Sequence, residues 1–295
     1  FTFANAREYL DQAIARGVSV DFVAPTLFTF LSSNIDFLPE IAKFRAARRV
    51  WAKLMREKYG TKDPASEKLR IFAFTAGSSL TAQQAMNNVV RTSIEMMSAA
   101  LGGIQTMHVS AFDEALGVPS EEAATLALRT QQVIAFETGV LDSPDPLAGS
   151  YELERMTDEL EREIWDLLAG IEKRGGALEC INNGYFVNEI SENSYKLTMA
   201  IESGARKVVG VNAFQSESAP IKPFEINPKS ESEQVAAVQA VRAKRDNAAV
   251  KVALDNLYTV AKAGDNVVPA TVEAIKAYAT VGEIVNELRK VYGKW

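Results

Sequence analysis

Apolar residues recur along the chain at two spacings that predict alternating helices and strands. A repeat near 3.6 residues predicts four helices in the first half of the chain, over residues 4–15, 35–59, 81–101 and 120–136. Short runs between them predict three strands, at residues 20–30, 69–75 and 104–110. Three strand-to-helix alternations predict parallel strands joined by crossover helices, and so an α/β sheet or barrel.

The second half of the chain is predicted to be mostly helical. Its apolar pattern predicts four further helices, over residues 151–174, 187–203, 232–262 and 272–292, with one strand-like run at 207–211. Thr81 and Gln84 have the spacing of a capping box. Three βα units cannot close a barrel, because both outer strands would keep unpaired backbone groups. We therefore expect the missing strands upstream or on another chain, and a natural protein that begins upstream of Phe1.

Composition and charge exclude several classes of protein. A chain of 295 residues with 47% hydrophobic and 24% charged residues can bury a sizeable core, so disorder is not its dominant state. The net charge of −6 and the scattered basic residues argue against a nucleic-acid or membrane surface. The one basic cluster is predicted to be a solvated helix face and comprises Arg45, Arg48, Arg49 and Lys53.

The single cysteine and the lack of a long apolar run indicate the cellular compartment of the protein. Cys180 alone forms no intrachain disulfide or cysteine-rich metal site, which suits a reducing compartment. No run reaches the roughly 18 apolar residues of a membrane helix. We therefore predict a cytoplasmic protein.

Candidate chemistry lies where the predicted strands end, as is usual in α/β folds. The three predicted ends are residues 25–28, 72–79 and 108–115. Phe28, Phe72 and Phe74 also fit ordinary core packing, and Gly77 also fits a turn. His108 is the only histidine, which excludes a multi-histidine metal site within this chain and more often indicates a structural residue than a catalyst.

A series of short motifs resembles one enzyme family in order along nearly the whole chain. They are EIAKFRAAR (40–48), TAG (75–77), SLTAQ (79–83), NNVVRT (87–92), FDEALG (112–117), RTQQ (129–132), DPLAGSY (145–151), VGVN (209–212) and TVGE (280–283). This set is similar to the large subunit of the adenosylcobalamin-dependent acyl-CoA mutases, the methylmalonyl-CoA and isobutyryl-CoA mutase family.

The resemblance implies an architecture and a reaction. Residues 1–140 would be the last βα units of a (β/α)8 TIM-type barrel that binds acyl-CoA, and residues 141–295 the helical C-terminal region. The corrin ring caps the carboxyl ends of the strands in that family. Homolysis of its cobalt–carbon bond gives an adenosyl radical, and the carbon skeleton of the acyl-CoA is isomerised.

The resemblance also implies roles for individual residues. Cofactor-binding positions would be Phe74, Gly77, Ser78, Ser110, Glu114 and Ala115. Substrate-binding positions would be Thr26, Phe28 and Phe72. No catalytic residue falls in this segment, because the family's catalytic histidine precedes it, and no residue here ligates a metal. The cobalt ligand would come from a separate small cobalamin-binding subunit, so a hetero-oligomer is expected.

Several of these positions depart from the family pattern. Thr26-Leu27-Phe28 stands where the family has Arg-Leu-Ser, and Phe72-Ala73-Phe74 where it has His-Thr-Gln or His-Ser-Gln. These changes remove a phosphate-binding charge and make the pocket wall apolar. The substrate is then a less polar acyl-CoA than methylmalonyl-CoA, or the chain is a non-catalytic structural subunit. An unrelated barrel enzyme is a third, less favoured interpretation.

Overall fold

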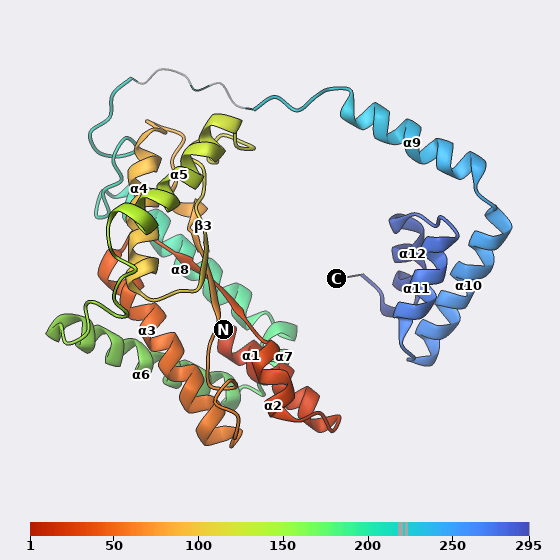
Figure 1. Ribbon diagram of the computed structural model, residues 1–295, viewed down its shortest axis with the longest axis horizontal. Coiled ribbons are helices and arrows are strands. Elements are labelled where there is room, and N and C mark those ends of the chain that lie inside the picture. The colour runs from red at the N-terminus through yellow and green to blue at the C-terminus, as the bar shows by residue number, and fades with distance from the viewer. Residues whose placement is uncertain (218–220, 222–223, 295) are drawn as a thin grey trace. The chain divides into compact units, whose positions relative to one another are not determined.

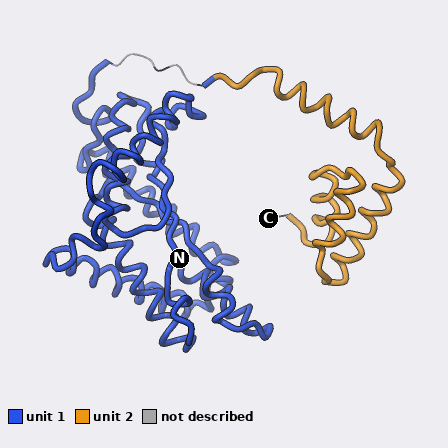
Figure 2. The backbone as a smooth tube through the Cα atoms, in the orientation of Figure 1, with its two compact units in different colours: residues 1–224 blue, residues 225–295 orange. Residues whose placement is uncertain are grey.

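The protein is an α/β chain, mostly helical, with one small parallel sheet (Figure 1). The computed structural model describes residues 1–217, 221 and 224–294. They fall into two compact units, residues 1–224 and 225–295 (Figure 2). In the described part of the chain, no helix is long and apolar enough to span a membrane. The predicted domain boundary after residue 140 separates the last units of a barrel from a helical region, and this boundary stays a prediction.

The sheet contains three parallel strands in the order β1-β2-β3. Their bounds are Thr29–Ser33, Ile71–Thr75 and Thr106–His108. Helix α3 (Phe37–Lys53), which continues as a π-helical turn to Lys58, joins the first two strands. Helix α4 (Asn87–Leu101) joins the second pair, and α5 (Glu121–Glu137) follows β3 with the Ser120 hydroxyl capping it. The predicted alternation is confirmed, with shorter strands.

The prediction of a strand over residues 20–30 is wrong for most of its length. Helix α2 (Val20–Val23) and a 3-10 turn (Ala24–Thr26) occupy this segment instead. Asp21 at the start of α2 accepts hydrogen bonds from the Ser66 hydroxyl at 2.9 Å and the Lys62 N–H at 3.2 Å. Pro25 lies in the first turn of the 3-10 segment, where its missing N–H costs nothing. The strand begins only at Thr29, where β2 offers a partner.

The predicted capping box at Thr81 is also wrong, because α4 begins later, at Asn87. The Thr81 hydroxyl donates to the Gln83 carbonyl at 2.8 Å instead of capping a helix. Gln84 has a positive φ of 48°, which no α-helical residue adopts. Residues 81–86 therefore form an irregular loop that leads from β2 to α4.

Alternate residues of the strands bury one face of the sheet. Ile71 and Ala73 of β2 are 1% and 0% exposed and pack in one core with Phe44 of α3 and Ala99 of α4. The same core reaches α1 (Thr2–Ala15), α6 (Tyr151–Lys173), α7 (Ala177–Asn182) and α8 (Tyr185–Glu202). The buried Trp51 of α3 also donates its indole N–H to the Ser66 carbonyl, at 3.0 Å.

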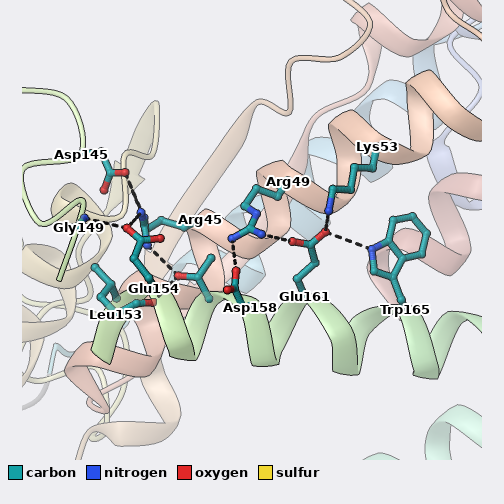
Figure 3. Close-up of polar contacts among 11 residues, drawn as sticks. Arg45, Arg49, Lys53, Asp145, Gly149, Leu153, Glu154, Asp158, Glu161 and Trp165 are labelled. Carbon is teal, nitrogen blue, oxygen red and sulfur yellow. Dashed lines mark hydrogen bonds and ion pairs between the residues drawn. The ribbon is translucent and has the colours of Figure 1, made fainter. Parts of the chain in front are cut away.

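The basic cluster on α3 does not form a solvated face, contrary to prediction. The side chains of Arg45, Arg49 and Lys53 face acidic residues of α6 and of the loop before it (Figure 3). The Arg45 side chain is 10% exposed and pairs with Asp145 at 3.1 Å and Glu154 at 2.7 Å. Glu161, 6% exposed, pairs with Arg49 at 2.7 Å and with Lys53. Arg48 caps the end of α4 by donating to the Gly102 carbonyl at 2.6 Å.

The second unit consists of helices. Helix α9 (Ser230–Lys244) leads to α10 (Asn247–Ala263), α11 (Val267–Lys276) and α12 (Val281–Tyr292). The single helices predicted over 232–262 and 272–292 are each two helices, because Asp246 and Thr280 cap new ones. Leu257 and Ala274 are fully buried between α10, α11 and α12. The predicted strand at 207–211 reduces to one bridge, between Val209 and Ala213.

Candidate functional site

The loops that follow β2 and β3 meet at the carboxyl edge of the sheet. Gly77 and Ser78 lie in a 3-10 turn directly after β2, and Glu114 and Ala115 follow β3; all four residues are exposed. A Cβ atom added to Gly77 would lie 3.7 Å from Glu114 Oε1. The structure thus brings these sequence-predicted positions together, and their cofactor role remains a prediction.

Ser110, another predicted cofactor position, links the two loops from the inside. It is 4% exposed. Its N–H donates to Thr75 Oγ1 at 2.7 Å and its hydroxyl to the Thr75 carbonyl at 3.3 Å. The polar groups of Ser110 are therefore used within the fold, where they fix the end of β3 against the end of β2.

Asn88 of α4 holds both loops, which sequence reasoning missed. Its side-chain amide is fully buried and donates to the Thr81 carbonyl at 2.9 Å and the Phe112 carbonyl at 2.8 Å. Its oxygen accepts from the Thr81 N–H at 3.1 Å and from Arg91 at 2.7 Å. The only available sequence signal was the placement of Asn88 within the motif NNVVRT.

The open face of the sheet, opposite the helices, carries phenylalanine rings. Because side chains alternate along a strand, Phe72 and Phe74 of β2 point away from the buried Ile71 and Ala73. Phe30 of β1, 56% exposed, lies opposite Phe72 with ring centroids 5.0 Å apart. Phe28, 59% exposed, contacts Phe30 at 5.3 Å. Sequence reasoning overlooked Phe30, although its two-residue spacing from Phe28 was a signal.

The segment 25–28 precedes a strand and does not end one, contrary to prediction. Thr26 closes the 3-10 turn, and its hydroxyl donates to the Val23 carbonyl at 2.7 Å. Thr26 and Phe28 therefore lie at the amino edge of the sheet, across from Gly77 and Glu114. Two predicted substrate positions thus lie at one end of the open face and the cofactor positions of the loops at the other. Phe72, the third substrate position, and Phe74, a further cofactor position, lie between them on β2.

A row of three side chains crosses the open face near its carboxyl edge. The strand register places Ser32 of β1 beside Phe74, and Phe74 beside His108 of β3. His108 is exposed at the end of its strand. Among the described residues no group of three metal-ligating side chains occurs. Ser32 and His108 lie on either side of the Phe74 ring, where each offers a hydrogen bond to a ligand.

A cavity of about 780 Å³ opens beside the loop after β2. Ser78 and Ser79 line it together with apolar residues of α4, α8 and the segment 206–211. Its charged lining is largely paired: Arg206 binds Asp36 at 3.1 Å, and Arg91 donates to the Val209 carbonyl at 2.8 Å. The cavity thus offers an apolar space with serine hydroxyls next to the carboxyl edge.

Glu95 of α4 is the least expected residue near this edge. Its side chain is 0% exposed, and neither carboxyl oxygen has a hydrogen-bond partner among the described residues. Burial raises the pKa of Glu95 to about 7, although the Ser79 hydroxyl and the Ala76 N–H face it and favour the charged form. Helical periodicity alone gave no sign of a buried, unpaired acid.

Comparison with known proteins gives consistent matches along the whole chain. The family model described as methylmalonyl-CoA mutase matches residues 1–294. The 2-hydroxyisobutanoyl-CoA mutase large subunit of Aquincola tertiaricarbonis is 43% identical over 299 residues, which cover 100% of this chain and 53% of that protein.

Two further relatives carry the name methylmalonyl-CoA mutase. The protein of Cereibacter sphaeroides is 41% identical and that of Escherichia coli 37% identical, and each match covers all of this chain and 42% of the relative. The chain therefore spans about half the length, or less, of the curated relatives it matches.

Proposed function

This chain belongs to the methylmalonyl-CoA mutase family, and from that premise we propose that it forms part of an isomerase that rearranges the carbon skeleton of an acyl-CoA. Residues 1–140 would supply the last βα units of a (β/α)8 barrel, and residues 141–295 its helical C-terminal region. The proposal rests on the family match over residues 1–294 taken together with the close approach of Gly77 and Glu114 at the carboxyl edge.

The carboxyl edge fits adenosylcobalamin in its shape and chemistry. Gly77 and Ala115 carry no bulky side chain, so a flat ring can approach the backbone there, and Glu114 presents an exposed carboxylate to amide or hydroxyl donors. When bound, adenosylcobalamin would supply the radical that removes a hydrogen atom from the substrate. The residues of this chain would position the reactants and exclude water.

The open face supports an apolar substrate wall. Phe28, Phe30 and Phe72 form a continuous series of ring contacts from the amino edge inward, and Phe74 lies nearer the proposed cofactor. Partly exposed rings of this kind gain free energy when an apolar ligand covers them. Ser32 and His108, beside Phe74, would hydrogen-bond the polar part of the acyl group. We infer a less polar acyl-CoA than methylmalonyl-CoA.

The proposed partner is a small cobalamin-binding subunit. One relative is named as a large subunit, which suggests a smaller companion. We propose that this partner supplies the cobalt ligand, as the resemblance to the family implies. We therefore propose a hetero-oligomer, and the single cysteine, Cys180, supports the cytoplasm as its compartment.

A screen of acyl-CoAs tests the reaction and the substrate class together. The full-length chain, its cobalamin-binding partner and adenosylcobalamin are incubated with branched, hydroxylated and aromatic acyl-CoAs, and products are separated by mass spectrometry. We expect one acyl-CoA to be converted to its skeletal isomer. Phe72→His and Phe74→Gln, which restore the family's polar side chains, should shift preference toward a more polar acyl-CoA.

Two outcomes oppose this proposal in different ways. If the complex binds corrin but converts no acyl-CoA, the chain is a non-catalytic structural subunit. The loss of polar groups at residues 26, 28, 72 and 74 would then explain why it has no activity. If no corrin binds, the assignment of the carboxyl edge is wrong.

A further inference from the structure

Within the part of the chain that the structure describes, the Glu95 carboxyl has no hydrogen-bond partner, because the two donors that face it are already engaged. The Ser79 hydroxyl donates to the Ala76 carbonyl at 2.8 Å, and the Ala76 N–H donates to the Ser33 carbonyl at 2.8 Å. The Ser33 hydroxyl donates to the main-chain carbonyl of Glu95 at 2.7 Å, not to its carboxyl group. A neutral carboxylic acid tolerates this arrangement far better than a buried carboxylate does.

The charged groups near Glu95 do not change its preference for the neutral form. From α3, the Glu40 carboxylate disfavours a second negative charge, and Glu40 is itself paired with Lys43. From α4, Arg91 favours the charge, but its guanidinium already binds Thr81, Asn88 and Val209. The loop 76–79 contributes the Ser79 hydroxyl and the Ala76 N–H that face Glu95, and so it is the neighbour that we expect to respond when Glu95 loses its proton.

We propose that Glu95 is a positioning residue for the loop 76–79, and that its proton sets how this loop presents Gly77 to the cofactor. As the neutral acid, Glu95 leaves the Ser79 hydroxyl on the Ala76 carbonyl and keeps the loop as observed. As the carboxylate, it takes the Ser79 hydroxyl for itself, since a charge-assisted hydrogen bond is about twice as strong as a neutral one. The Ala76 carbonyl then loses one of its two donors and keeps only the Ser79 N–H, at 3.0 Å, which weakens the 3-10 turn.

This inference rests on the proposed cofactor role of Gly77, and it predicts a pH effect on the loop with or without cofactor. The first measurement is hydrogen exchange of the backbone amides of residues 76–80 in the full-length protein, expressed as protection factors between pH 6 and pH 8.5. We expect protection to fall by roughly 3- to 10-fold as pH rises, the equilibrium effect of one hydrogen bond. Glu95→Gln should keep the low-pH value throughout.

Two variants separate a positioning role from a structural one. Ser79→Ala removes the hydroxyl that the carboxylate would recruit, and so it should also abolish the pH dependence. Glu161→Gln alters another buried acid, on α6, whose partners are on α3. It should leave the pH dependence of the loop unchanged. The same pH profile in wild type, Glu95→Gln and Ser79→Ala would overturn the inference.

The second measurement links the loop to the cofactor. Adenosylcobalamin affinity of the complex with its cobalamin-binding partner is titrated by absorbance over the same pH range. We expect affinity to fall several-fold with rising pH in wild type and to stay constant in Glu95→Gln. If cobalamin does not bind at any pH, the proposed function fails, and the exchange measurement still decides the role of Glu95.

Discussion

At the scale of single residues, Glu95 links pH to the stability of the fold. Its pKa of about 7 in the folded protein exceeds the 4.5 of an ordinary glutamate because the side chain is buried. Between these values the folded state keeps a proton that the unfolded state has released. The stabilising effect of that proton is complete below pH 4.5 and is lost as pH rises through 7, a decline of about 3 kcal/mol.

Glu95→Gln should therefore flatten part of the pH dependence of unfolding. The amide is neutral at every pH, so we expect the variant to be similar to wild type at pH 5 and more stable by about 2 kcal/mol at pH 8. Urea unfolding of the full-length protein at both pH values measures the difference. A variant that loses stability between pH 5 and pH 8 as steeply as wild type would contradict the account.

Asn88 acts at the same scale on the loops that form the candidate site. Asn88→Ala leaves the buried carbonyl of Phe112 and the partly buried carbonyl of Thr81 without this donor, which should cost about 3 kcal/mol. Hydrogen exchange should also speed up in both loops. Asn87→Ala is the matched control, because the Asn87 side chain donates to Gln84, at 3.0 Å and on the same segment, and is not fully buried. Equal losses in the two variants would refute this role of Asn88.

At the scale of elements, ion pairs fix α6 against α3. Arg45 is the most buried cation of the contact and donates to Thr157 as well as to two acids (Figure 3). Removing it leaves the carboxylates of Asp145 and Glu154 without their cation, while the Thr157 hydroxyl keeps its bond to the Leu153 carbonyl. Arg45→Ala should therefore lower the free energy of unfolding by about 2 kcal/mol.

Arg155→Ala provides the control for Arg45→Ala on the outer side of α6. Arg155 is about half exposed, and its ion pairs in the described part of the chain are with Glu152 and Glu159 of the same helix. Surface pairs of this kind contribute little. Thermal unfolding should separate the two variants clearly, and a similar midpoint for both would show that the α3–α6 pairs are not structural.

Helix α12 contains a second pH-dependent element. Hydrogen bonds from Arg245 lower the pKa of Glu283 to about 2, and Glu283 also completes the capping box with Thr280. Because the folded pKa is depressed, its contribution is present above pH 4.5 and is lost as pH falls toward 2. Glu283→Gln should cost about 1 kcal/mol at pH 7, and the difference from wild type should shrink by pH 3. Thermal unfolding at both pH values checks this, and a gap that does not shrink would contradict it.

At the scale of the whole molecule, the sequence predicted the order of elements better than their contacts. Local periodicity sufficed for the three βα units, because each buries one stripe or one face. It failed at residues 20–28, where aromatic and β-branched residues form helical turns with no strand partner. The basic residues of α3 were misjudged because their acidic partners lie about 100 residues away in α6 and the loop before it.

The candidate site was predictable to the extent that it follows from strand topology. Gly77 and Glu114 meet because parallel strands end at one edge. Phe30 and Asn88 were missed because their importance depends on pairing register and on long-range hydrogen bonds. The burial of Glu95 depends on three elements that pack around it, and a one-dimensional pattern does not contain that information.

The assignment of the carboxyl edge to the corrin ring is tested most directly by adenosylcobalamin binding to the assembled full-length complex that carries Gly77→Val. A Cβ there makes only ordinary contact with Glu114, so Gly77→Val should fold normally. Gly117→Val is the matched control, since no atom lies within 4 Å of its Cβ position. If the carboxyl edge faces the corrin, Gly77→Val should weaken binding roughly tenfold or more while Gly117→Val does not. Wild-type affinity in Gly77→Val would contradict the account.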